Sequence, residues 1–286
     1  MSGIELTSTK SARVTAARRL AKRAARTQQR LFLAEGPQAV REAVARPGVV
    51  KELFITADAA RRHPELATIK NVPTHRVSGQ VMESLAQTVT PQGVIAVCGY
   101  LDVPLATVTA ARPRLVAVLA AVRDPGNAGT VIRVADAAGA DAVVLTDSSV
   151  DAYNGKCVRA TAGSLFHLPV VIGVAAEPAL AELRGAGLRV VAADGHAPRD
   201  LDDALDRGEL AGSTAWLFGN EAWGLPAELT GLADLAVRVP IHGRAESLNL
   251  ATAAAVCLYA SARAHRAAQP GAEDSYPSRL GKYVGN

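Results

Sequence analysis

The chain has 286 residues, 49% of them hydrophobic and 20% charged, which is the composition of a globular protein large enough for one large domain or two ordinary ones. The net charge is +4, no run of 18 apolar residues is free of charges, and the N-terminus lacks the apolar core of a signal peptide, so we expect a cytoplasmic protein without a membrane span. Cys98, Cys157 and Cys257 are odd in number and far apart, which excludes a disulfide framework and a zinc-type spacing.

The basic surplus is concentrated at the start of the chain. Residues 1–30 hold eight Lys and Arg residues against Glu5 alone, so the rest of the chain sums to −3. The segment lacks the acidic residues that would pair with these cations along a helix, and this favours a polyanion such as RNA as its partner. A solvated helix that only aids solubility is the alternative. We expect RNA contacts from Arg18, Arg19, Lys22, Arg23 and Arg26.

The first hundred residues alternate between helical and extended patterns. Helices are predicted over residues 9–30, 37–46, 57–63 and 78–87, and strands over 31–36, 50–56, 74–78 and 93–101. This alternation predicts a small α/β domain over residues 1–103. Two prolines and a weak periodicity follow, and we expect residues 104–114 to be a linker.

The alternation starts again after this linker. Strands are predicted over residues 115–122, 142–146, 169–174, 188–193, 214–219 and 235–239, and helices over 127–139, 176–186, 200–207 and 247–266. The strands are continuous apolar runs, as expected for a parallel sheet that is buried on both faces. We therefore predict a second α/β domain over residues 115–268, followed by a flexible tail over residues 269–286 that is rich in Pro, Gly and Ser.

Three of these strands lead into loops of unusual composition: DPGNAGTVIR, AWLFGNEAWGLP and VRVPIHGRAESLNLATAAAV. In an open α/β sheet, ligands bind beyond the carboxyl ends of strands. In the first loop, Gly126 and Gly129 allow the backbone to approach a ligand or a helix closely, and Asn127 is a candidate helix cap whose helix could bind a phosphate. Arg133 could reach back to the same anion. Singly these signals are weak, because the full GxGxxG pattern and the P-loop Lys-Ser/Thr pair are missing; no Cys/His cluster suggests a metal.

In combination, the three loops resemble a known family. NAGTVIR, FGNEAWGL and VPIHGRAESLNLATA are similar, in order and spacing, to the three motifs of the SpoU class of RNA ribose 2′-O-methyltransferases, within the SPOUT superfamily. KCVRATAGSLFHLPV resembles a further family segment that contains Arg159. RLFLAEGPQAVREAV and TVTPQGVIAV resemble the substrate-binding domain often fused in front, which is similar to a ribosomal-protein RNA-binding fold. The resemblance covers about residues 10–265.

The resemblance implies a parallel-sheet methyltransferase domain with a deep trefoil knot, a homodimer, and S-adenosyl-L-methionine as cofactor. It implies that Arg133 acts on the ribose 2′-OH from the opposite subunit, with support from Asn127, Glu221, Ser247 and Asn249. It further implies an RNA contact at Arg159. The implied cofactor-binding residues are Leu217, Phe218, Gly219, Asn220, Val239, Ile241 and Leu248.

Several alternatives stay open at this point. Because arginine is normally protonated, Arg133 could stabilise charge on the 2′-oxygen or bind the adjacent phosphate, and the residues do not decide whether it takes the proton itself. The substrate expected is 23S rRNA, and tRNA is the alternative. A base methyltransferase, or a non-catalytic RNA-binding or ribosome-assembly factor, is the alternative to the ribose methyltransferase itself. Trp223 and Glu246 depart from the small residues common in the family, and Trp223 could stack on a base or simply pack.

Overall fold

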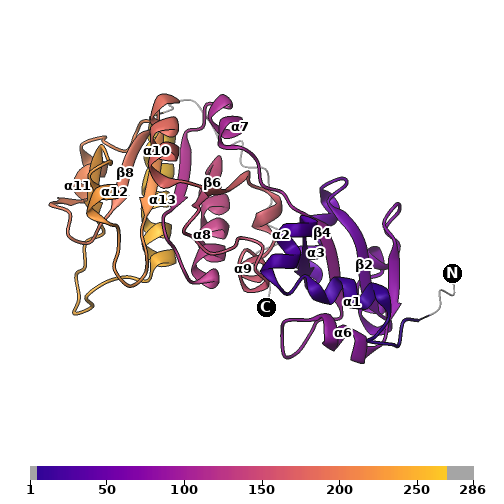
Figure 1. Ribbon diagram of the computed structural model, residues 1–286. Coiled ribbons are helices and arrows are strands. Elements are labelled where there is room, and N and C mark those ends of the chain that lie inside the picture. The colour runs from indigo at the N-terminus through magenta and orange to yellow at the C-terminus, as the bar shows by residue number, and fades with distance from the viewer. Residues whose placement is uncertain (1–4, 269–286) are drawn as a thin grey trace.

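A computed structural model describes residues 5–268, which form two β-sheets with helices on both sides (Figure 1). The indigo and violet N-terminal part carries a four-stranded sheet, and the magenta to yellow part carries a sheet of seven strands within this range. The predicted flexible tail, residues 269–286, lies outside the described residues.

The N-terminal sheet has the strand order β1-β4-β2-β3, with β4 antiparallel to both neighbours and β3 parallel to β2. Its elements are α1 (Ala12–Arg19), α2 (Arg23–Gln29), β1 (Leu31–Glu35), α3 (Pro37–Ala45), β2 (Val50–Thr56), α4 (Ala57–Arg62), α5 (Pro64–Ala67), β3 (Thr74–Val77), α6 (Gly79–Leu85) and β4 (Val94–Gly99). One face of this sheet packs against α1 and α6, where Val14, Phe54 and Val81 are fully buried. The predicted α/β pattern of this region is therefore confirmed.

The prediction of a single helix over residues 9–30 is wrong, because the helix is interrupted by a turn between α1 and α2. Leu20 ends α1 and turns its side chain into the core. The Arg26 guanidinium donates to the carbonyls of Leu20 and Ala21, at 2.8 Å each, so the break leaves these acceptors satisfied.

The predicted linker also contains a helix, α7 (Leu105–Ala110). Leu105 and Val108, three residues apart, are buried against the second sheet in a cluster that includes Leu180. The helix is short and follows Pro104, so its periodicity is too brief to stand out in the sequence.

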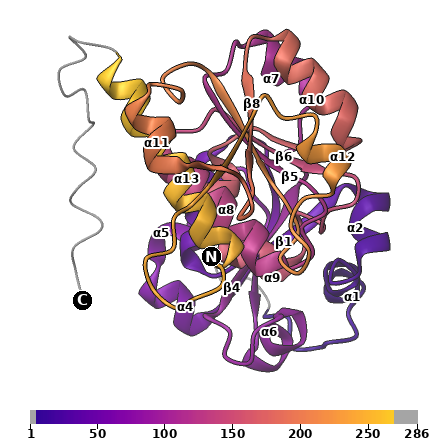
Figure 2. The same cartoon turned by 90° about the vertical axis from the view of Figure 1, so that its left-hand side faces the viewer.

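The second sheet is parallel throughout, with the order β7-β6-β5-β10-β8-β11-β9. Its elements are β5 (Leu115–Leu119), α8 (Pro125–Ala138), β6 (Ala142–Thr146), α9 (Gly155–Ala160), η1 (Ser164–Phe166), β7 (Val170–Val174), α10 (Ala176–Gly185), β8 (Arg189–Ala193), β9 (Arg199–Asp200), α11 (Leu201–Asp206), β10 (Thr214–Phe218), α12 (Ala227–Thr230), β11 (Leu235–Arg238) and α13 (Leu250–Ala267). Figure 2 shows α8, α11 and α13 on one side of the sheet and α7, α10 and α12 on the other. Burial of both faces explains the continuous apolar runs in β5, β6 and β10.

The strand order reverses beside β5. From β5 the chain runs outward through α8 to β6 and β7, whereas the other neighbour of β5 is β10, almost a hundred residues later. A ligand site is expected beyond the carboxyl ends of strands at such a switch point. The loops after β5, β10 and β11 leave the sheet at this edge. The predicted trefoil knot stays a prediction.

The two parts share a continuous buried core. The Phe32 ring of β1 lies 4.8 Å from the Tyr153 ring and 6.0 Å from the Phe166 ring, measured between centroids. Arg26 of α2 pairs with Asp151, and Arg46 donates to the Phe166 carbonyl. The N-terminal sheet is therefore packed directly against the part of the chain that carries the second sheet.

Candidate functional site

The N-terminus of helix α8, after the turn from β5, is capped by Asp124 and not, as predicted, by Asn127. Asp124 Oδ1 accepts the backbone N–H of Asn127 at 2.8 Å, and Pro125 occupies the first helical position. Lys156 Nζ donates to Asp124 Oδ2 at 2.6 Å; this contact, with the Asn127 N–H, lowers the pKa of Asp124. The Asn127 side chain is left free for other partners.

Asn127 uses that freedom to join the three motif loops. Its Nδ2 donates to Glu221 Oε1, in the loop after β10, at 3.0 Å. Its Oδ1 accepts from Nδ2 of Asn249, in the loop before α13, also at 3.0 Å. Asn249 Oδ1 in turn caps α13 by accepting the N–H of Ala251 at 2.9 Å. We call the side-chain chain Glu221–Asn127–Asn249 the motif bridge.

Glu221 is held as a carboxylate in this bridge. Its oxygens also accept the backbone N–H groups of Arg123 and Asp124, at 3.3 Å each. Partial burial acts to raise the pKa of Glu221, but the hydrogen bonds from Asn127 and the backbone outweigh it and hold the pKa below its usual value. Glu221 is therefore ionised at neutral pH and acts as an acceptor that closes the β5 loop onto the β10 loop.

The β10 loop itself is tightly closed. Asn220 Nδ2 donates to the Ala121 carbonyl at 2.8 Å, and Asn220 and Gly224 exchange two backbone hydrogen bonds of 2.9 Å. A Cβ on Gly219 would lie 2.4 Å from the Gly224 carbonyl carbon, so this position accepts only glycine without a rearrangement. Leu217, Phe218, Gly219 and Asn220 are buried at the end of β10, beside the motif bridge.

The third group of predicted cofactor residues lies on a more exposed loop. Val239 is half-buried, whereas Ile241 and Leu248 are 38% and 37% exposed. Ser247 lies on the same loop, exposed, without a side-chain hydrogen bond to any residue in 5–268. Trp223, at the tip of the β10 loop, is 61% exposed and does not pack in a core.

Arg133 is not brought into the motif bridge. It lies on the exposed side of α8, six residues beyond Asn127, and among residues 5–268 it makes no side-chain hydrogen bond or ion pair. Gly129, between them, packs α8 onto α9: a Cβ there would lie 2.4 Å from the Cys157 carbonyl oxygen. The glycine thus serves a close approach between helices.

The basic N-terminal residues divide into two groups. Arg18, Arg19, Lys22 and Arg23 are exposed, as an RNA contact requires. Arg26 departs from the prediction: its side chain is only 3% exposed, and its Nε donates to Asp151 Oδ2 at 3.0 Å. A guanidinium satisfied in this way is part of the fold and is not available to RNA.

Arg159 is also drawn into the contact between the two parts of the molecule. It is half-buried on α9, with Nη1 at 3.3 Å from the carboxylate of Glu35 on β1.

In the described part of the chain, no three His, Cys, Asp or Glu side chains are grouped as a metal site would require. No helix in that part has the length and apolar character of a membrane span.

Comparison with known proteins agrees with this geometry. Residues 114–259 match the model of the SpoU rRNA Methylase family, and residues 11–96 match that of the MRM3-like substrate binding domain. The chain belongs to the SpoU rRNA methylase family. The α/β fold expected from the motif resemblance is confirmed, and the motif bridge joins all three motifs of that resemblance.

Among its relatives is the 23S rRNA (guanosine(2553)-2′-O)-methyltransferase RlmP of Bacillus subtilis, 39% identical over 257 residues, which are 89% of this chain and 98% of that protein. Similar crystal structures include the AdoMet-bound rRNA methyltransferase from Sinorhizobium meliloti, with a TM-score of 0.79, 31% identity and coverage of 91% of this chain and 97% of that one. The SpoU methyltransferase AviRb from Streptomyces viridochromogenes in complex with AdoMet also has a TM-score of 0.79, at 28% identity and coverage of 90% and 100%.

Proposed function

We propose that the protein transfers a methyl group from S-adenosyl-L-methionine to a ribose 2′-OH of ribosomal RNA, with 23S rRNA as the substrate. The observation that carries this proposal is the motif bridge, in which Asn127 joins Glu221 and Asn249 at the switch point of the parallel sheet. The similarity to RlmP over nearly the full length of both proteins supports the substrate class. The N-terminal domain is proposed to bind the RNA.

The residues at this edge fit S-adenosyl-L-methionine. Ile241 and Leu248 offer apolar side chains to the flat adenine base of the cofactor. The exposed backbone of residues 241–249 offers hydrogen-bond donors and acceptors to the polar groups of that base. The backbone of Leu217, Phe218, Gly219 and Asn220, at the buried end of β10, and the half-buried Val239 would border the rest of the site. The cofactor supplies a methyl group already activated by a sulfonium. The ionised Glu221 and Asn249 would hold the loops around it in place.

Arg133 is proposed to act on the RNA. Its guanidinium has no partner among residues 5–268 and can bind a phosphate beside the target ribose while stabilising the charge that develops on the 2′-oxygen. The distance of Arg133 along α8 from the motif bridge supports a site completed by a second subunit, and we propose a homodimer. Ser247 would support the same ribose from the β11–α13 loop.

The test is methyl transfer from labelled S-adenosyl-L-methionine to unmodified transcripts of 23S rRNA, 16S rRNA and tRNA. We expect label in 23S rRNA. Because one transition-state donor contributes a factor of about 10²–10³ in kcat, Arg133→Ala should lose at least that factor while the Kd for S-adenosyl-L-methionine changes less than about threefold. Label in tRNA alone would contradict 23S rRNA as the substrate. Label on a base would contradict ribose 2′-O-methylation as the reaction.

A second pair of variants tests the motif bridge. Asn127→Asp places a carboxylate against Glu221 and removes the donated hydrogen bond, so the loops should separate and both cofactor binding and turnover should fall. Asn71→Asp makes the same change at an exposed site in the N-terminal part and should leave both unchanged. Equal behaviour of the two variants would show that the bridge has no role in the reaction.

A further inference from the structure

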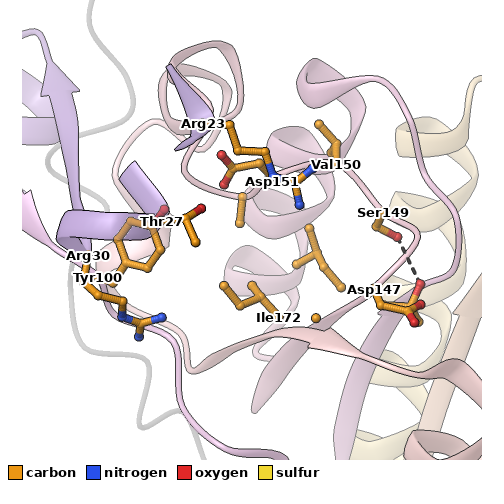
Figure 3. A pocket seen from close by; sticks show the side chains of 13 residues that line it. Arg23, Thr27, Arg30, Tyr100, Asp147, Ser149, Val150, Asp151 and Ile172 are labelled. Atoms are coloured by element: carbon orange, nitrogen blue, oxygen red, sulfur yellow. Dashed lines mark hydrogen bonds between the residues drawn. The ribbon is translucent and has the colours of Figure 1, made fainter. Parts of the chain in front are cut away.

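A cavity of about 170 Å³ opens between the N-terminal helix α2 and the carboxyl ends of β6 and β7 (Figure 3). One side comes from the substrate-binding part of the chain and the other from the methylase part. Its lining residues include Arg23, Thr27, Arg30, Tyr100, Asp147 and Ile172. None of them belongs to the site proposed above for the cofactor.

This cavity lies on the same edge of the sheet as the motif bridge. Ser149, in its wall, donates to the Leu119 carbonyl at the end of β5 at 2.8 Å and accepts the Val122 N–H at 3.3 Å. Ala121, in the same turn, accepts from Asn220 of the β10 loop at 2.8 Å. Because β6 and β7 are the first and second neighbours of β5, and strands lie about 4.8 Å apart, the cavity is roughly 5–10 Å from the β5 turn.

The chemistry of the lining suits a nucleotide. Arg23 is exposed and makes no side-chain hydrogen bond or ion pair within residues 5–268, so it is available to a phosphate. The Arg30 guanidinium lies over the Tyr100 ring, 4.7 Å from its centroid, and pairs with Asp102. Asp147 is exposed and has no side-chain partner in the same range, so it can accept from a base. Ile172 adds an apolar surface.

The size of the cavity limits what it can hold. Sites for drug-sized ligands measure about 300–1,000 Å³, whereas a cavity of about 150 Å³ admits one benzene ring. A cavity of about 170 Å³ therefore has room for a single nucleobase and not for a whole cofactor. Figure 3 shows Arg23 at one margin, Arg30 and Tyr100 at another, and Asp147 and Ser149 across the opening from Tyr100.

We propose that this cavity binds one nucleotide of the RNA substrate that lies next to the methylated nucleotide. Arg23 binds its phosphate, and Asp147 accepts a hydrogen bond from the exocyclic amino group of its base, which selects cytosine over uracil among the pyrimidines. This inference rests on the proposed function, because it assigns a second contact on the same RNA. It makes the boundary between the two parts of the molecule a specificity site.

The test measures binding of fluorescein-labelled eight-nucleotide oligocytidylate and oligouridylate to the full-length protein by fluorescence anisotropy. We expect Arg23→Ala to weaken both by about tenfold and to reduce the slope of log K against log salt by about 0.7, the value for one lost phosphate contact on a single strand. The control Arg207→Ala removes the same charge from the end of α11, which follows β9 at the other end of the strand order from β7. It should change neither oligonucleotide affinity by more than about twofold.

Asp147→Asn tests the base contact separately. The wild-type protein should prefer oligocytidylate by about tenfold. The variant should lose most of this preference, because its amide oxygen can accept from cytosine N4 and its amide nitrogen can donate to uracil O4, so the affinity for oligouridylate rises toward that for oligocytidylate. The proposal is overturned if Arg23→Ala behaves like Arg207→Ala, or if the preference is absent in the wild type or unchanged in Asp147→Asn.

Methylation of 23S rRNA by the same preparations separates the two proposals. A wild-type protein that binds oligocytidylate through Arg23 and methylates no RNA contradicts the proposed function and leaves the cavity assignment intact. A wild-type protein that methylates rRNA, with an unchanged KM for RNA in Arg23→Ala, contradicts the cavity assignment and leaves the proposed function intact.

Discussion

Gly129→Ala should loosen the helix that carries both Asn127 and Arg133. The added Cβ would lie 2.4 Å from the Cys157 carbonyl oxygen and 2.7 Å from Ala160 Cβ, so α8 or α9 must move. Alanine in a helix interior gains about 1 kcal/mol over glycine, whereas overpacking costs about 1–3 kcal/mol, and more where a backbone atom is the obstacle. We expect a net loss of about 2 kcal/mol and a Tm lower by about 4–8 °C.

Urea denaturation of wild type and variant measures this loss as a lower midpoint at an unchanged m-value. The matched control is Gly185→Ala at the end of α10, where the added Cβ meets nothing within 4 Å. That variant should be neutral or more stable by up to about 1 kcal/mol. If Gly129→Ala is as stable as Gly185→Ala, the close packing of α8 on α9 does not explain the glycine.

Three further predictions concern single side chains. Burial raises the pKa of Cys157 to about 12 and of Cys257 to about 12, so the native protein should resist a thiol reagent that labels the urea-unfolded chain at once; rapid labelling of the native protein would contradict this. Burial acts to lower the pKa of His167, but hydrogen bonds to two carboxylates outweigh it and raise the pKa above its usual value. The protonated His167 therefore stabilises the fold below about pH 6.5, and this stabilisation is lost as the pH rises through the folded pKa. His167→Gln should lower the Tm more at about pH 6 than at about pH 8. Trp223 is exposed whereas Trp216 is fully buried, so acrylamide should quench only part of the native tryptophan emission, and Trp223→Phe should abolish this quenchable part; equal quenching in both proteins would place Trp223 in a covered site.

The architecture of the second sheet was predictable because its strands are buried on both faces. Such strands appear in the sequence as unbroken apolar runs such as LVAVL, AVVLT and TAWLF, and glycine-containing loops follow the first and the last of these. The helix α7 was not predictable in the same way. It has a single apolar pair, Leu105 and Val108, and only the sheet beside it shows why those two positions are buried.

The cap of α8 could have been assigned from sequence more accurately. Asp124 and Asn127 both suit an N-cap, but proline favours the first helical position, so Pro125 indicates Asp124 as the cap. The consequence matters for the site, because an Asn127 side chain used as a cap could not form the motif bridge.

The role of Arg26 was beyond sequence reasoning. The basic segment shows its charges but not that one of them meets Asp151, 125 residues away, inside the contact between the two parts. The motif bridge is similar: spacing places Asn127, Glu221 and Asn249 in three loops, and only the order of the strands brings these loops to one edge of the sheet.

Alkaline hydrolysis of the labelled RNA product tests the central claim most directly. A 2′-O-methyl group removes the hydroxyl through which alkali cleaves the neighbouring phosphodiester bond. The account predicts that label transferred to 23S rRNA by the wild-type protein appears in one alkali-resistant dinucleotide, and that Arg133→Ala yields less than about one hundredth as much in the same reaction time. Label released in mononucleotides would place the methyl group on a base and contradict the account.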